Sequence, residues 1–72
     1  MRKPIDHALQ RLCEIYDKKR TSALEEYWDI GLSGYSDDQI VKALKGYYER
    51  NENPFFPTPK EFIQYKFLSP SM

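Results

Sequence analysis

The chain has 72 residues, which is enough for one domain with a small hydrophobic core. A core of this size rarely contributes more than ~3–5 kcal/mol, so either the aromatic residues pack well or a partner adds stability. One cysteine and one histidine exclude an intrachain disulfide and leave no set of metal ligands. With no signal-peptide pattern and no apolar run near the ~20 residues of a membrane span, we expect a cytoplasmic protein.

Eleven basic and eleven acidic residues cancel, but they are unevenly placed. Residues 1–20 hold six basic and three acidic side chains, residues 21–40 hold five acidic and no basic ones, and residues 41–72 hold five basic and three acidic ones. Nucleic-acid-binding proteins usually carry a strong basic excess, which this chain lacks. Solvated helix faces are the commonest cause of such segregation, and a protein partner of opposite charge is the functional alternative.

The first helix is predicted over residues 4–18, after a frayed basic start at 1–3. Pro4 suits a first turn because its missing N–H would be unsatisfied there. The basic residues at 18–20 favour the negative end of the helix dipole. The apolar positions recur at helical spacing and form a stripe that we expect to be buried. They are Ile5, Ala8, Leu9, Leu12, Ile15 and Tyr16.

The second helix is predicted over residues 22–32. Thr21 or Ser22 can cap it, and Ser22 also begins a capping-box pattern. Trp28 should be the centre of the core, because an indole offers the largest single apolar gain in this chain. Gly34 is expected to stop the helix. The expected inner face comprises Leu24, Tyr27, Trp28, Gly31 and Leu32.

The third helix, over residues 36–50, has the clearest signals. Ser36 and Gln39 form a capping box, and Tyr35 can close over Ile40 as a hydrophobic staple. Acidic residues occupy the first turn, where they complement the helix dipole. The apolar face recurs with the period of a helix. It consists of Ile40, Ala43, Leu44, Tyr47 and Tyr48.

The fourth helix is predicted over residues 58–68. Residues 51–54 end the third helix, and residues 55–57 form an extended apolar connection restricted by the following proline. Thr58 as cap, a proline at the first position and Glu61 as the capping-box partner open the fourth helix. We therefore predict one all-α domain over residues 1–72, a small bundle of about four short helices.

We find no pattern for catalysis. His7 and Cys13 are six residues apart and lie on different sides of one helix, so they do not form a nucleophile and base pair. The three glycines match neither common phosphate-binding loop. We expect no enzymatic activity, no cofactor, no metal and no small-molecule substrate, and we expect binding to be the function.

Eleven aromatic residues are many for so short a chain. Most must fill the core, but the adjacent pairs Tyr47 and Tyr48, and Phe55 and Phe56, cannot all point inward. We expect the exposed members of these pairs to contact a partner, because aromatic residues are enriched at protein interfaces.

Three segments, taken in order, resemble one family. They are Trp28–Leu32, then Tyr35–Leu44 with the pattern S-x-x-Q-I-x-x-A-L, then Phe55–Phe62 with the pattern F-P-T-P-x-E-F. Together they look like the replicative-helicase loader and inhibitor proteins of bacteriophages, and more distantly like lambda-type replication protein P. The resemblance covers about residues 8–68. It implies an N-terminal helical domain followed by a flexible C-terminal region, not matched here, that engages the hexameric helicase. It also implies contact with an origin-binding initiator protein.

The favoured hypothesis is a non-catalytic adaptor of phage or mobile-element DNA replication, whose partner is a replicative helicase or an initiator protein. Its predicted contact residues are Glu25, Glu26, Asp29, Asp37, Asp38, Tyr47, Tyr48, Phe55 and Phe56. A stand-alone inhibitor that sequesters a host replication or defence protein through the same surface is the second hypothesis. A small DNA-binding module is the third, and its phosphate-contacting residues would be Lys42, Lys45, Arg50, Lys60 and Lys66.

Overall fold

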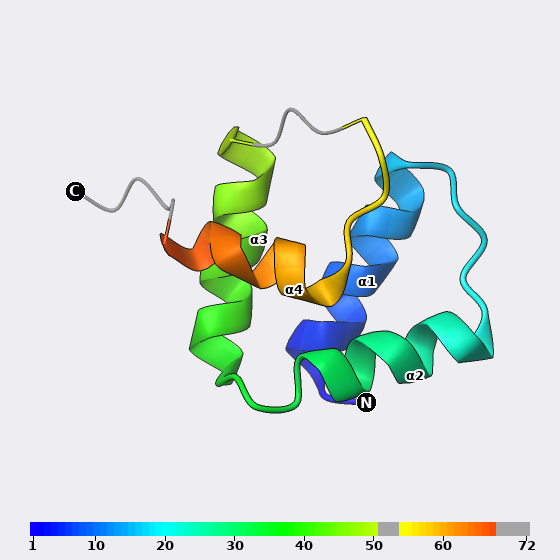
Figure 1. Ribbon diagram of the computed structural model, residues 1–72, viewed down its shortest axis with the longest axis horizontal. Helices are drawn as coiled ribbons and strands as arrows, with labels where there is room; N and C mark the ends of the chain where they lie inside the picture. The colour runs from blue at the N-terminus through cyan, green and yellow to red at the C-terminus, as the bar shows by residue number, and fades with distance from the viewer. Residues whose placement is uncertain (51–53, 68–72) are drawn as a thin grey trace.

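The computed structural model describes residues 1–50 and 54–67, and these form helices joined by short connections, with no strand among them. The elements are α1 (Lys3–Ile15), α2 (Ser22–Gly31), α3 (Asp37–Arg50), α4 (Pro59–Ile63) and the 3-10 helix η1 (Gln64–Phe67). The prediction of a small all-α bundle of about four short helices is confirmed (Figure 1).

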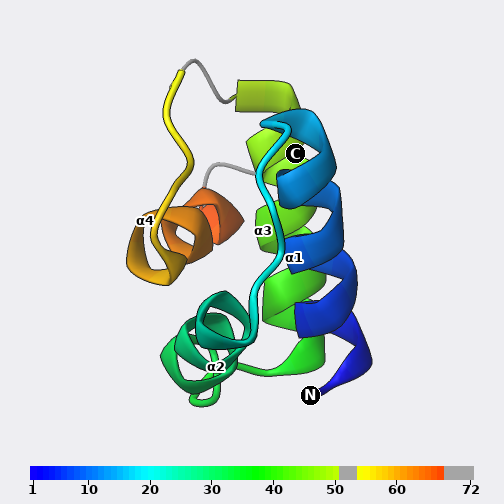
Figure 2. The same ribbon diagram turned by 90° about the vertical axis from the view of Figure 1, so that its right-hand side faces the viewer.

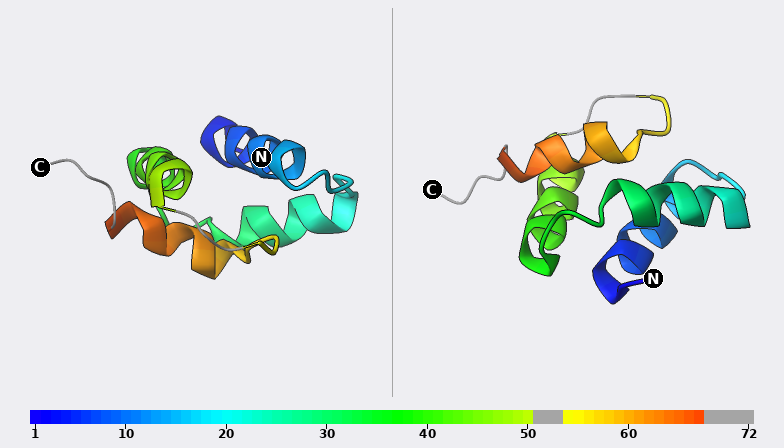
Figure 3. Two further views of the ribbon diagram at one scale, coloured as in Figure 1. Left: turned by 90° about the horizontal axis from the view of Figure 1, so that it is seen from above. Right: turned by 60° about the horizontal axis from the view of Figure 1, so that its bottom comes forward.

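The helices form two layers. Figures 2 and 3 show α1 and α3 side by side in one layer, and α2 and α4 with η1 in the other. The core lies between the layers, and side chains from all four helices contribute to it. The buried apolar residues are Ile5, Ala8, Leu9, Leu12, Cys13, Trp28, Leu32, Ile40, Ala43, Leu44, Tyr47, Phe62 and Ile63.

Aromatic rings form much of this core. Trp28 is fully buried, and its indole packs against Phe56 and Phe62, with ring centroids 6.0 and 5.3 Å away. Phe62 also contacts Tyr47, and the hydroxyl groups of Tyr47 and Tyr16 are hydrogen-bonded to each other. The prediction that Trp28 is the central core residue is therefore confirmed.

The first helix ends three residues earlier than predicted. Asp17 adopts a left-handed backbone conformation with φ of 52°, and the Lys18 N–H donates to the Cys13 carbonyl at 2.9 Å. The Asp17 N–H donates to the Glu14 carbonyl at 3.4 Å. These two bonds are those of a Schellman motif, which satisfies the last carbonyls and turns the chain away from the helix axis. The predicted helix over 16–18 is wrong for this reason.

The expected fraying of residues 1–3 is also wrong. The Arg2 guanidinium donates hydrogen bonds to the carbonyls of Leu32, at 3.1 Å, and of Tyr35. It also lies 3.6 Å from the Asp37 carboxylate. Arg2 thus joins the start of α1 to the turn between α2 and α3, and the positive charge lies at the C-terminal end of α2, where it complements the dipole.

The caps of α3 and α4 follow the prediction. The Gln39 N–H donates to Ser36 Oγ at 3.2 Å, and the Ser36 N–H donates to Gln39 Oε1 at 2.9 Å. The Glu61 N–H donates to Thr58 Oγ1 at 3.2 Å, and the reciprocal bond to Glu61 Oε1 is 3.0 Å. Helix α4 lasts only five residues before the tighter η1, and the predicted last residue, 68, lies outside the described residues.

At the start of α2 the structure selects one of the two predicted caps, and at its end it corrects the predicted role of Gly34. Thr21, the first of the two candidates, is the cap, because the Leu24 N–H donates to Thr21 Oγ1 at 3.1 Å. Gly34 has no left-handed conformation, so it does not terminate the helix as predicted. Gly31 has the packing role: a Cβ built on it would lie 2.7 Å from Pro59 Cβ. This close approach fixes the end of α2 against the start of α4.

Candidate protein-binding face

Helix α2 is fixed to the rest of the molecule at several points. Arg2 binds the turn after it, Gly31 touches α4, and Trp28 enters the core. At its N-terminal end, Arg20 donates to the Glu25 carboxylate at 2.7 Å and also binds Asp6 of α1. The helix is thus held in a defined position even though little of its own surface is buried.

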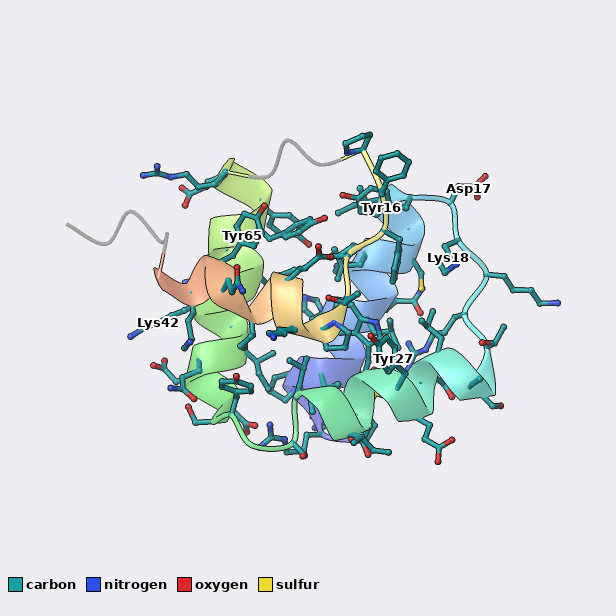
Figure 4. All side chains as sticks on the ribbon, in the orientation of Figure 1. Tyr16, Asp17, Lys18, Tyr27, Lys42 and Tyr65 are labelled. Atoms are coloured by element: carbon teal, nitrogen blue, oxygen red, sulfur yellow. The ribbon has the colours of Figure 1, made fainter. Side chains whose placement is uncertain are left out.

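Trp28 is the only buried residue within α2, so the predicted inner face is partly wrong. Tyr27, labelled in Figure 4, is 53% exposed, and Gly31 is exposed. Leu24 is half-buried and packs against the core. Each helical residue advances about 100° around the axis, so when Trp28 faces the core, Tyr27 faces away from it.

A second apolar residue joins Tyr27 on the outer side. Ile30, which the sequence reasoning did not single out, is 66% exposed. Ala23 is exposed as well, and Ala23, Tyr27 and Ile30 follow one another at i, i+4 and i+7. We use the term α2 face for these three residues together with Glu26 and Asp29. The same spacing in the sequence was the signal that could have identified Ala23 and Ile30.

The five acidic residues predicted as contacts differ in their surroundings. Glu25 pairs with Arg20, Asp37 pairs with Arg2, and Asp38 lies 3.2 Å from Lys42 Nζ. Within residues 1–50 and 54–67, no ion pair involves Glu26 or Asp29. Glu26 is exposed and Asp29 is half-buried. Neither carboxylate is therefore paired with a basic residue of the described part of the chain, so both can pair with basic groups of a partner.

The four aromatic residues predicted as contacts also separate. Tyr47 is only 2% exposed, so its ring is not available to a partner, whereas Phe56 is half-buried against Tyr16 and Trp28. Burial and the bond to Tyr16 raise the pKa of Tyr47. Tyr48 and Phe55 are 53% and 74% exposed. They come from the end of α3 and from the connection to α4, away from α2 (Figure 1).

The basic residues of the DNA-binding hypothesis are divided between the two layers. Lys42 pairs with Asp38, and the Lys66 ammonium lies over the Tyr35 ring at 5.3 Å from its centroid. The other three, Lys45, Arg50 and Lys60, are exposed. Two of the five side chains thus already have intramolecular partners, which weakens the case for a continuous phosphate-binding surface.

No cluster of metal ligands occurs in the part of the chain that the structure describes. His7 is exposed whereas Cys13 is buried, so the two side chains do not meet. Burial raises the pKa of the Cys13 thiol, which favours the neutral, unreactive form. Among the described helices, none is long and apolar enough to cross a membrane.

Comparisons of the chain with protein-family models, curated proteins and solved structures yield no match. The α2 face is therefore the candidate functional site, because exposed apolar groups lie there with two carboxylates that have no ion pair among the described residues.

Proposed function

We propose that this protein is a non-catalytic interaction module that binds a basic protein surface through the α2 face. We further propose that it acts in the bacterial cytoplasm as an adaptor of phage-type or mobile-element DNA replication. One observation carries the proposal: Tyr27 and Ile30 are mostly exposed, and the exposed Glu26 belongs to the same side of α2. Burying these side chains against a partner would recover apolar contact area that folding leaves in water.

The rigid placement of α2 supports this role. Arg2, Arg20 and the contact between Gly31 and Pro59 hold the helix before any partner arrives. The backbone of α2 is therefore already ordered, so α2 would lose little conformational entropy when a partner binds. Tyr27 also has the rigid, amphipathic ring that is common among residues that dominate binding energy.

The resemblance to phage helicase loaders supports the choice of partner. It favours a replicative helicase or a replication initiator, and the carboxylates of Glu26 and Asp29 favour a basic patch on that partner. Complementary charge would speed association and select the partner. Binding through this face should therefore weaken as the salt concentration rises, because salt screens exposed charges.

A pull-down from bacterial lysate with the intact protein as bait tests the proposal. We expect a replicative helicase or an initiator to be recovered by the native protein and lost with Glu26→Lys. Glu49→Lys is the matched control, since Glu49 is an exposed glutamate on α3 and gives the same change of charge. Glu25 is left unchanged because its reversal would also break the pair with Arg20.

The recovered partner should then be titrated with purified protein. Glu26→Lys is expected to weaken binding at least about tenfold, which corresponds to ~1.4 kcal/mol. Equal binding by Glu26→Lys and the native protein would contradict the proposal, as would recovery of nuclease-sensitive material alone. Stoichiometric addition to a helicase assay would separate an adaptor from an inhibitor, because only an inhibitor lowers the activity.

A further inference from the structure

The α2 face has a geometry that restricts what can lie on it. Its apolar residues Ala23, Tyr27 and Ile30 form a single stripe along the helix axis. Ala23 and Ile30 are seven residues apart, which corresponds to about 10 Å along the axis of an α-helix. The stripe is therefore long and narrow, with the length of about two helical turns.

Among the residues of α2, charge lies on one flank of this stripe only. Each residue advances ~100° around the helix. On one side of the stripe, Glu26 lies next to Ile30 and Asp29 lies further round, whereas on the other side Gly31 lies next to Tyr27. Gly31 is the residue that approaches Pro59, so that second flank adjoins the start of α4. A partner on the stripe thus meets carboxylates along one edge and the start of α4, at Pro59, near the other.

A second copy of this chain is a poor occupant. Helix α2 contains three acidic residues and no basic ones, so pairing two α2 helices would bring like charges together. A β-strand is also a poor occupant, because the described residues form no sheet edge that could donate main-chain hydrogen bonds. A helix needs no such bonds, since its side chains pack as ridges into the grooves of another helix.

We infer that the α2 face binds an amphipathic helix of the partner, with apolar residues against Tyr27 and Ile30 and with lysine or arginine facing Glu26 and Asp29. This inference rests on the proposed function, because it describes the element of the partner that occupies the same face. It makes a narrower claim: the bound element is helical, is basic on one flank, and lies along α2.

Synthetic peptides of about 15 residues, long enough to form a helix, provide the probe. One carries leucine at positions a and d of a heptad and lysine on one flank. A second has the same composition in an order without helical period, and a third has glutamate in place of lysine. Binding of each labelled peptide to the intact protein is measured by fluorescence anisotropy, and the contacted residues are mapped by amide chemical shifts.

We expect the helical basic peptide to bind at least about tenfold more tightly than either of the others, with the largest shifts in Ser22–Gly31. The double substitution Tyr27→Ser/Ile30→Ser should weaken it at least about tenfold, since exposed aromatic and aliphatic anchors carry much of such binding. Val41→Ser is the control, because Val41 is 42% exposed but belongs to α3. Circular dichroism verifies that all variants remain folded.

Equal binding of the periodic and aperiodic peptides, or shifts centred outside α2, would overturn the inference. Concentration-dependent dimerisation through α2 in sedimentation would overturn it too. If Glu26→Lys still abolishes capture of the replication partner in that case, the proposed function stands and only the helical occupant is wrong. If the peptide binds α2 but no replication protein is captured, the inference survives and the proposed function fails.

Discussion

Helices α2 and α3 begin in the same way, with a hydroxyl cap before an acidic first turn, but the fold uses them differently. Helix α3 buries Ile40, Ala43, Leu44, Gly46 and Tyr47, whereas α2 buries Trp28 alone. Helix α3 thus contributes to the core from Ile40 to Tyr47. Helix α2 is held by a few specific contacts and leaves an apolar stripe exposed to solvent. A helix in this protein can therefore be firmly placed without being largely buried.

Trp28 is the only buried residue of α2 and anchors this helix in the core, so its removal should have the largest effect. Trp28→Ala should cost ~3–5 kcal/mol, because it removes a fully buried indole that packs on Phe56 and Phe62. A domain of this size has little more stability than that, so we expect chemical denaturation to find the variant largely unfolded. A cooperative transition close to that of the native protein would show that α2 does not depend on this anchor.

Trp28→Phe is the control for that substitution. The Trp28 Nε1–H has no hydrogen-bond partner among the described residues, so replacing the indole by a phenyl ring loses volume but no bond. We expect this variant to stay folded with a smaller loss than Trp28→Ala.

The next effect concerns the contact between α2 and α4. Gly31→Ala places a Cβ 2.7 and 2.9 Å from two carbons of the Pro59 ring, which is too close for either to remain in place. Such overpacking costs ~1–3 kcal/mol, so after the ~1 kcal/mol that alanine gains over glycine in a helix we expect a net loss of stability of up to ~2 kcal/mol. Thermal denaturation of Gly34→Ala serves as the comparison. A Cβ on Gly34 meets nothing within 4 Å, so that variant should be as stable as the native protein or slightly more so.

A smaller loss of stability is expected when the hydroxyl group that caps α2 or α3 is removed. Ser36→Ala and Thr21→Ala should each cost ~1 kcal/mol, because each hydroxyl accepts a backbone N–H of the first turn. Ser22→Ala should change the free energy of unfolding by less than ~0.5 kcal/mol, since Ser22 lies inside α2 and Thr21 is the cap. Urea denaturation of the three variants measures this directly. An equal loss for Ser22→Ala would show that the cap is shared.

The smallest effect is the pH dependence of the link between α1 and α2. The hydrogen bond and charge of Arg20 lower the pKa of Asp6 below its ordinary value. A lowered pKa in the folded state means that the stabilisation is complete above the ordinary aspartate pKa of about 3.9 and is lost as the pH falls through the folded value. The stability difference between the native protein and Asp6→Asn should therefore be present at neutral pH and vanish in strong acid. A difference that persists in acid would contradict the role of this charge.

Sequence patterns could not predict which side of α2 faces the core. The residues of α2 contain two apolar stripes with helical spacing, one through Leu24 and Trp28 and one through Ala23, Tyr27 and Ile30. Periodicity identifies both equally well, because it depends only on spacing. Packing decides between them: the indole fits the space lined by Phe56 and Phe62, so Trp28 turns inward and Tyr27 is carried outward.

The sequence by itself determined the number of helices, the start of each and most of the core, because caps and apolar periods act over three or four residues. The capping boxes at Ser36 and Thr58 are examples. Only the tertiary structure decided the long-range bonds of Arg2 and Arg20 and the exposure of the α2 face. Those features join residues far apart in the chain, and their energies depend on a three-dimensional fit that no local pattern contains.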